Sequence, residues 1–241
     1  MTALAVFGAS GPTGRQVVEQ ALASGHRIAA VTRKPDEFPF KSEQLDVVSA
    51  DVTDPDGVER ALRGAQAVIS TFGVPYSRSE ITVYSQGIAN ITRAMAAHGI
   101  GRLVCVSSTT VAREDAPGES LLWRRVVGPL LRNRLGRTLY DDMERMEGIV
   151  QASGLDWTIV RPGGLFNLAE PTSDYEVGPP RLPGRVTARA DLAEVLIRAA
   201  TEPGHSQAII EVITRSARPS PLTFLREAFG GGNLERGADS G

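Results

Sequence analysis

The 241-residue sequence contains one cysteine, Cys105, so it cannot form an intrachain disulfide. Cys105 lies inside an apolar run, a setting that favours a small buried hydrophobe over a reactive thiol. No apolar stretch approaches the roughly 18 residues that a membrane span requires. The chain opens without a basic region or an apolar signal core. These absences predict a protein of the reducing cytoplasm with no membrane partner.

Lysine is almost absent as well. Lys34 and Lys41 are the only two among 26 basic residues, and the others are arginines. The formal net charge of -2 gives no reason to expect nucleic acid or an anionic membrane as a partner. We expect a small-molecule substrate and no metal site, and both a monomer and a homodimer remain open.

A glycine-rich turn follows the first apolar run. Residues 4–7 have the length of a strand, residues 15–24 carry helical spacing, and GASGPTG stands between them. The order strand, glycine turn, helix is typical of a dinucleotide site, although the spacing is G-x-x-G-x-x-G instead of the usual G-x-G-x-x-G. Its alternative is a plain structural turn.

Each glycine of this turn has its own expected task. Gly8 permits a tight turn, Gly11 lets the backbone approach a pyrophosphate, and Gly14 lets the helix pack near the strand. The free N–H groups at the start of the helix then face the phosphates. The cofactor contacts expected here are Gly8, Ser10, Gly11, Pro12, Thr13 and Gly14.

A basic residue ends the second expected strand, at residues 27–32. In a dinucleotide site an acidic residue at this place binds the ribose 2′-hydroxyl of NAD, whereas an arginine accommodates the 2′-phosphate of NADP. Arg33 stands there, with Lys34 beside it, which predicts NADP unless Arg33 is an ordinary surface residue. Asp51, after the third strand, is placed either to accept from the adenine amino group or to stabilise a turn.

Strands and helices alternate along the whole chain. Further strands are expected at 45–50, 67–71, 103–106, 157–160 and 208–213, and further helices at 54–62, 81–98, 140–153, 190–201 and 221–229. This alternation predicts an α/β, Rossmann-type, doubly wound and mostly parallel sheet with helices on both faces. We expect one domain over residues 1–229 and a disordered tail over 230–241.

Two segments interrupt the alternation. Residues 113–137 carry six arginines among apolar side chains, and they are either a cover over the substrate site, a subunit contact or a solvated helix. Residues 167–185 are rich in proline and glycine and are expected to form an excursion on the substrate side.

Hydroxyl side chains end the buried strand 103–106. Because ligands of open α/β sheets bind beyond the carboxyl ends of the strands, Ser107 and Ser108 are expected near the ligand, unless they are turn residues.

With these motifs the sequence resembles the atypical short-chain dehydrogenase/reductases of the NAD(P)H-binding, NmrA-like type, and most of all the biliverdin reductase B (NADPH-flavin reductase) branch. The resemblance implies that the glycine turn holds the pyrophosphate of NADP and that Arg33 binds its 2′-phosphate. It places Asp51 and Val52 at the adenine, Ser107 and Ser108 near the nicotinamide, and Pro162 and Gly163 under its far side. The remaining cofactor contacts predicted are Thr71, Phe72 and Gly73, where strand 67–71 ends.

The catalytic pair Tyr-x-x-x-Lys of classical members is missing. In those proteins the tyrosine donates a proton and the lysine lowers its pKa. The register set by Ser153 and Gly154 puts Leu139 and Met143 at the two positions, and Tyr140 lies about 100° of helix turn away. The remaining candidates for catalysis are Ser108 and Tyr140.

Two classes of function follow. One is an NADPH-dependent reductase that transfers a hydride to a flavin, a quinone or another conjugated acceptor, which requires mainly juxtaposition. The other is a non-catalytic NADP(H)-binding redox sensor. The fold alone does not separate them.

Overall fold

The computed structural model describes residues 1–77, 79–112, 125, 132 and 136–216. The strands in these residues are β1 (Ala3–Phe7), β2 (Arg27–Thr32), β3 (Leu45–Ser49), β4 (Ala67–Ser70), β5 (Arg102–Val106), β6 (Asp156–Pro162), β7 (Gly164–Phe166), β8 (Tyr175–Gly178), β9 (Val186–Ala188) and β10 (Ala208–Thr214). The helices are α1 (Pro12–Ala23), α2 (Pro55–Ala61), α3 (Val83–His98), α5 (Arg137–Ala152) and α6 (Arg189–Thr201), with short 3₁₀ turns η1 (Pro35–Glu37) and η2 (Thr109–Val111).

Eight of the strands form one sheet in the order β3-β2-β1-β4-β5-β6-β10-β8. All neighbours are parallel except β8, which runs antiparallel to β10. The strand order reverses between β1 and β4. In doubly wound sheets this switch point opens the crevice in which a dinucleotide binds, so the fold class expected from the sequence is confirmed.

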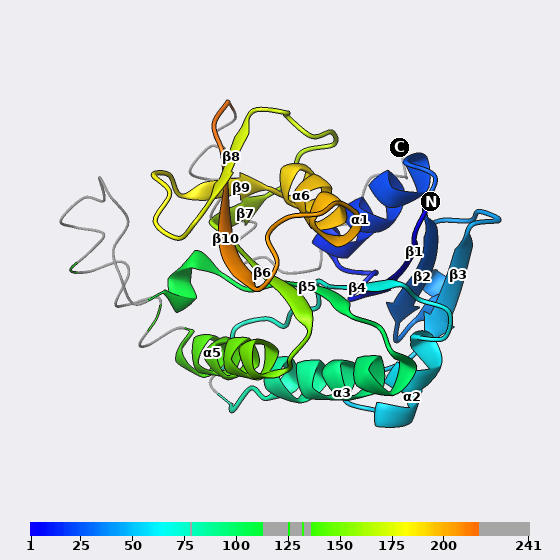
Figure 1. Ribbon diagram of the computed structural model, residues 1–241. Coiled ribbons are helices and arrows are strands. Elements are labelled where there is room, and N and C mark those ends of the chain that lie inside the picture. The colour runs from blue at the N-terminus through cyan, green and yellow to red at the C-terminus, as the bar shows by residue number, and fades with distance from the viewer. Residues whose placement is uncertain (78, 113–124, 126–131, 133–135, 217–241) are drawn as a thin grey trace, which may run out of the picture.

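Helices cover both faces of the sheet. Figure 1 shows α1 and α6 over one face and α2, α3 and α5 over the other. Neighbouring residues of a strand point to opposite faces, so Leu103 and Cys105 belong to the core under α3 and α5, and Val104 belongs to the core under α1 and α6. All three are fully buried. Burial raises the pKa of the Cys105 thiol, which confirms the unreactive cysteine expected from its apolar run.

Helix boundaries follow local chemistry. The first helix begins at Pro12, earlier than the apolar spacing predicts, because proline is tolerated in the first turn. Gly99 ends α3 in the left-handed conformation, with φ of 66°, as its place after His98 predicts.

The buried Asp142 of α5 accepts hydrogen bonds from Tyr84 N at 2.8 Å and from the Ser85 hydroxyl at 2.5 Å. A carboxylate from the neighbouring helix therefore caps the N-terminus of α3.

Three short strands were not expected. The segment at 167–185, expected as an irregular excursion, contains β8, which pairs with β10 at the edge of the sheet. A separate two-stranded sheet joins β7 to β9. Strands of three or four residues are too short for a period-two pattern, and their pairing is set by distant residues. The expected helix at 221–229, the expected tail at 230–241 and nearly all of 113–137 lie outside the described residues.

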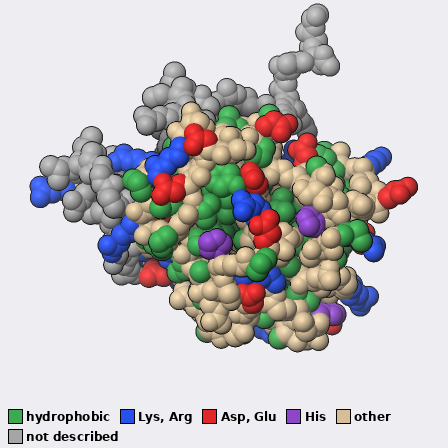
Figure 2. All heavy atoms as spheres, turned by 45° about the horizontal axis from the view of Figure 1, so that its top comes forward, with side chains coloured by type: hydrophobic (Ala, Val, Ile, Leu, Met, Phe, Trp, Pro, Cys, Tyr) green, Lys and Arg blue, Asp and Glu red, His purple; other side chains and the backbone are tan. Residues whose placement is uncertain are grey.

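The surface carries charges of both signs. On the face shown in Figure 2, acidic and basic side chains of the described residues are interspersed around apolar ones. Together with the small net charge, this is the pattern of an ordinary solvated surface. In the described part of the chain, no helix is long and apolar enough to cross a membrane.

Candidate functional site

The glycine turn after β1 is fixed by close backbone contacts. Gly8 has a φ of 79°, and a Cβ there would lie 2.5 Å from the backbone nitrogen of Phe72. A Cβ on Gly14 would lie 2.2 Å from the carbonyl oxygen of Gly8. Neither position accepts a side chain without a shift of the backbone. Gly8 therefore permits the tight turn, and Gly14 permits the close packing of α1 on the strand, as the sequence predicts.

Gly11 differs from its two neighbours in the turn. Its backbone is extended, with φ of -71°, and a Cβ would meet only the Gly8 carbonyl oxygen, at 3.2 Å. This contact is tight, but it is less severe than those at Gly8 and Gly14. An open approach to the backbone for a ligand is a second physical reason for glycine at position 11.

The N-terminus of α1 is open to an anion. No side chain caps it, its first turn holds no acidic residue, and its first N–H groups have no partner within the helix. With the macrodipole of a 12-residue helix behind them, these groups fit the pyrophosphate of a dinucleotide. Thr13, expected to add a hydroxyl, is buried, so its side chain is largely withdrawn from the surface.

The ribose end of the site gathers at the end of β2. The hydroxyls of Ser10 and Thr32 lie 2.5 Å apart, so Ser10 stands beside the strand end that leads into Arg33. The Arg33 side chain is 79% exposed, and its Nη1 is 3.9 Å from Oδ2 of Asp51. Lys34 instead pairs with both carboxylate oxygens of Glu37. Arg33 is thus extended and available for a phosphate.

Asp51 and Val52 lie where the adenine is expected. The backbone N–H and the hydroxyl of Thr53 lower the pKa of Asp51 and outweigh its partial burial, and Arg33 adds a smaller effect. Asn90 of α3 donates to the Val52 carbonyl at 3.0 Å, which ties this loop to the helix. Asp51 therefore both stabilises its own turn, through Oδ1, and keeps a charged Oδ2 at the site.

The loop after β4 closes over the glycine turn. The Thr71 hydroxyl donates to the Phe7 carbonyl at 3.0 Å, so its proton serves the backbone. Phe72 packs against Tyr84 with ring centroids 5.9 Å apart. Because a Cβ on Gly8 would strike the backbone of Phe72, the segment Thr71–Gly73 borders the same crevice as the glycine turn.

The two serines after β5 point to different environments. The Ser107 hydroxyl is buried and donates to Oε1 of Glu147 at 2.5 Å. The Ser108 hydroxyl is partly exposed and accepts from the backbone nitrogen of Thr110 at 3.2 Å. Only Ser108 therefore offers its proton to a ligand, and Ser107 is committed to the protein interior.

Glu147 was not among the residues expected at the site. Its buried carboxylate receives Arg161 Nε at 2.9 Å and Nη2 at 2.5 Å, in addition to Ser107. The three residues come from α5, β6 and the end of β5. One sequence signal pointed to it: Glu147 lies four residues after Met143 and eight after Leu139, on the helix face that the register assigned to the site.

The register of α5 places apolar side chains where the catalytic pair would stand. Leu139 and Met143 are both buried. Tyr140 is buried as well, but its hydroxyl lies 2.8 Å from that of Tyr76, in the loop after β4. Tyr140 therefore packs in the core and also reaches the carboxyl edge of the sheet.

Pro162 is the last residue of β6 and Gly163 follows it, but packing within the protein explains the glycine. A Cβ on Gly163 would lie 2.6 Å from the backbone of Arg185, and its N–H donates to the Thr187 hydroxyl at 2.9 Å. The close approach of residues 185–187 therefore requires glycine here. This contact makes the start of β7 and β9 part of the edge on which the nicotinamide is expected.

The family model for NAD(P)H-binding domains matches residues 8–203. The chain belongs to the NAD(P)H-binding family. An uncharacterized chloroplastic protein of Arabidopsis thaliana, At2g34460, is 32% identical over 225 residues, which are 89% of this chain and 77% of that protein. The matched residues include the glycine turn after β1.

Solved structures share the fold of this NAD(P)H-binding protein. A short-chain dehydrogenase/reductase from Veillonella parvula, in complex with NADP, superposes with a TM-score of 0.73 at 19% identity, covering 91% of this chain and 99% of that one. ChuY, an anaerobillin reductase from Escherichia coli O157:H7, superposes with a TM-score of 0.69 at 23% identity, covering 91% and 100%. These likenesses show that the chain shares its fold with both structures.

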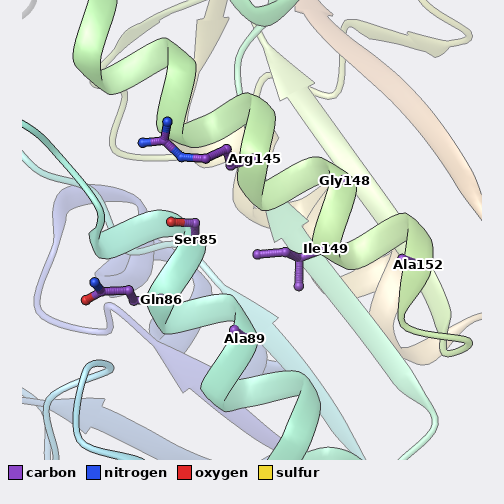
Figure 3. A pocket seen from close by; sticks show the side chains of 7 residues that line it. All are labelled: Ser85, Gln86, Ala89, Arg145, Gly148, Ile149 and Ala152. Atoms are coloured by element: carbon purple, nitrogen blue, oxygen red, sulfur yellow. The ribbon is translucent and has the colours of Figure 1, made fainter.

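Two hollows lie near α5. The first, of about 600 Å³, is a groove between α3 and α5 that Figure 3 shows, and its lining residues are Ser85, Gln86, Ala89, Arg145, Gly148, Ile149 and Ala152. None of these seven was expected at the cofactor site. The second, of about 480 Å³, is lined by Val111, Ala112, Glu144, Glu147, Gly148, Gln151, Arg161, Pro180 and Arg181. It adjoins the Ser107–Glu147–Arg161 cluster, on the substrate side of this NAD(P)H-binding fold.

Proposed function

We propose that the protein is an NADPH-dependent reductase that transfers a hydride to a flavin, a quinone or another conjugated small molecule, without a Tyr-Lys pair. The observation that carries this proposal concerns the reactive edge, by which we mean the carboxyl edge of the sheet, where the nicotinamide is expected. Buried Leu139 and Met143 stand on the active-site face of α5, while the glycine turn beside that edge is built for a dinucleotide. A site with a hydride source and no tuned acid suits acceptors whose reduced form is already stabilised.

Each group of residues then has its own proposed role in binding or catalysis. The first turn of α1 and Gly11 hold the pyrophosphate, and Arg33 with Ser10 holds the 2′-phosphate. NADPH, when bound, supplies the hydride. Ser108, whose oxygen is occupied by the Thr110 N–H, turns its hydroxyl proton to the acceptor and orients it. The Glu147–Arg161 pair keeps the ends of β5 and β6 in place beneath these contacts.

Further features support this proposal. The NADP complex of the Veillonella protein supports NADP as the cofactor, and the Escherichia coli anaerobillin reductase supports a reductase on this fold. Residues 1–229 are proposed to act as one domain. The single, buried Cys105 supports the cytoplasm as the compartment.

Steady-state oxidation of NADPH tests the function. The acceptors are FMN, a quinone, a conjugated enone and a simple ketone, each also measured with NADH. We expect turnover with FMN or the quinone, little with the ketone, and a preference for NADPH. Tight NADPH binding without turnover of any acceptor would instead identify a non-catalytic redox sensor. Gly11→Val, which we expect to fold without binding NADPH, is the control for oxidation that does not use this site.

A further inference from the structure

Two tyrosine hydroxyls meet at the carboxyl edge of the sheet. Tyr76 OH and Tyr140 OH lie 2.8 Å apart, and their rings pack edge to face with centroids 6.2 Å apart and an angle of 60° between the planes. Tyr140 is 6% exposed, whereas Tyr76 is 40% exposed. A buried phenol therefore holds the hydroxyl of a phenol that reaches the surface.

The position of Tyr76 is set by the fold. It follows Phe72 and Gly73 in the loop after β4, the segment that borders the glycine turn. The Val74 N–H donates to the Tyr84 hydroxyl at 3.2 Å, and the Thr138 hydroxyl donates to the Ser77 carbonyl at 3.0 Å. The loop is thus fastened on both sides of Tyr76, in the segment that leaves the carboxyl end of β4.

Gly136, just before α5, makes room for the pair. A Cβ there would lie 2.5 Å from the Tyr140 ring and 2.9 Å from the Tyr76 ring. Figure 1 shows that α5 lies beside α3, whose preceding loop carries Tyr76, so segments far apart in the sequence form this contact. The packing requires glycine at position 136, since a side chain would push the two phenols apart.

The surroundings of Tyr140 favour its protonated form. Burial, followed by the neighbouring Tyr76, raises the pKa of Tyr140, so it keeps its proton. The geometry of the pair allows either hydroxyl to donate. In the arrangement in which Tyr140 donates to Tyr76, the Tyr76 proton is left to point outward.

We propose that Tyr76 donates the proton to the reduced acceptor, with Tyr140 as the residue that positions its hydroxyl. This inference rests on the proposed reductase function. The acceptor takes a hydride, which carries two electrons, from NADPH, and NADPH leaves as NADP⁺. The O–H bond of Tyr76 breaks as an N–H or O–H bond forms on the acceptor. Water then returns a proton to the exposed Tyr76 oxygen.

The chemistry of Tyr76 matches the acceptors proposed above. No lysine follows position 41, so α5 carries no ammonium group beside the phenol. Tyr76 therefore lacks the partner that activates the tyrosine of a Tyr-Lys pair. Tyr76 suits acceptors that take the proton after the hydride has been transferred. Removal of its hydroxyl is expected to lower kcat by about 10- to 100-fold, near the lower end of the 10²–10⁴-fold range of general acids.

The test uses the full chain with Tyr76→Phe, Tyr140→Phe and the control Tyr175→Phe, a tyrosine of the edge strand β8. We measure NADPH binding, kcat and KM with FMN and with a quinone, and the pH profile of kcat. For Tyr76→Phe we expect kcat to fall about 10- to 100-fold, with KM and NADPH affinity within about twofold of the unmodified protein.

Tyr140→Phe separates positioning from structure. It removes the phenol that holds the Tyr76 hydroxyl in place. We expect kcat to fall about three- to tenfold, with KM and NADPH affinity within about twofold of the unmodified protein. A purely structural role of Tyr140 would instead lower the NADPH affinity together with kcat. Tyr175→Phe should leave kcat and KM unchanged.

A second variant at position 76 tests whether the lost activity reflects the loss of a proton donor. Tyr76→His keeps a titratable proton donor, so it should recover part of the activity and lose it above a pH of about 6.5, the ordinary pKa of histidine. Unchanged kcat and pH profile in a folded Tyr76→Phe would overturn the role of Tyr76 while leaving the reductase intact. An unmodified protein that binds NADPH but reduces no acceptor would overturn the reductase, and the role of Tyr76 with it.

Discussion

Glu147 and Arg161 form a two-bond ion pair inside the protein, with Nε to Oε1 at 2.9 Å and Nη2 to Oε2 at 2.5 Å. The two side chains are 5% and 11% exposed. The pair joins α5 to β6, and through Ser107 it also joins β5. A buried charge without its partner is costly, so this contact matters more for stability than an exposed ion pair would.

Truncation of Glu147 tests that relationship. We expect Glu147→Ala to lower the free energy of unfolding by about 3–5 kcal/mol, because Arg161 stays buried without a counter-charge. Glu147→Gln, which still accepts from Ser107, should cost less, and the exposed Glu19→Gln should be neutral. Urea unfolding followed by circular dichroism measures all three. A cost below about 1 kcal/mol for Glu147→Ala would mean that water reaches Arg161.

We expect Arg33 to determine the choice between NADPH and NADH. We expect Arg33→Asp to weaken NADPH binding by roughly 1.5–3 kcal/mol, the scale of a charged hydrogen bond, and to leave NADH almost unaffected. Arg63→Asp, an exposed arginine after α2, is the control of equal charge change. Titration of each nucleotide gives the affinities. Equal affinities for NADPH and NADH in the unmodified protein would contradict this assignment.

Gly11 and Gly14 should respond in opposite ways. Gly11→Val places its side chain where the pyrophosphate approaches, so binding of NADPH is lost while the fold remains, since only one protein atom lies near. Gly14→Ala drives a Cβ against the Gly8 carbonyl, so the protein loses about 1–3 kcal/mol of stability. Nucleotide titration and thermal unfolding are both measured. A folded Gly11→Val that binds NADPH normally would show that the site lies elsewhere.

Ser107 and Ser108, the two serines after β5, should affect different properties when each is replaced by alanine. Ser108→Ala should lower kcat with FMN by about 10- to 100-fold, because its hydroxyl orients the acceptor, with little change in stability. Ser107→Ala should instead cost stability, about 1–3 kcal/mol, because its hydroxyl is committed to Glu147. Turnover and chemical unfolding are compared for both. The assignment fails if Ser107→Ala loses turnover and Ser108→Ala does not.

Tyr84 predicts a loss of stability in alkali. Burial raises the pKa of this tyrosine to about 12, above its unfolded value of about 10. The folded state thus holds the proton more tightly, so this contribution is complete below pH of about 10 and is lost as the pH rises toward 12, by about 2–3 kcal/mol. Tyr84→Phe should flatten the fall of unfolding free energy over this window. An identical slope in the variant would contradict the prediction.

The sequence by itself determined the architecture and predicted the place of the cofactor. Apolar runs of strand length alternating with helical spacing predict a doubly wound sheet, because each element must bury its own face. Gly8 and Gly14 could be assigned their tasks in advance, since a tight turn and a close helix contact are local needs of the backbone. The absence of lysine after position 41 excluded the Tyr-Lys pair by composition alone.

Only the tertiary structure decided which side chains meet at the reactive edge. Ser107 and Ser108 are neighbours with similar sequence surroundings, but Glu147, 40 positions away, binds the first and leaves the second. Tyr76 meets Tyr140 across 64 positions, and β8 exists because β10 offers it an edge. Such contacts depend on packing between elements distant in the chain, whereas periodicity and turn chemistry describe only neighbours along it.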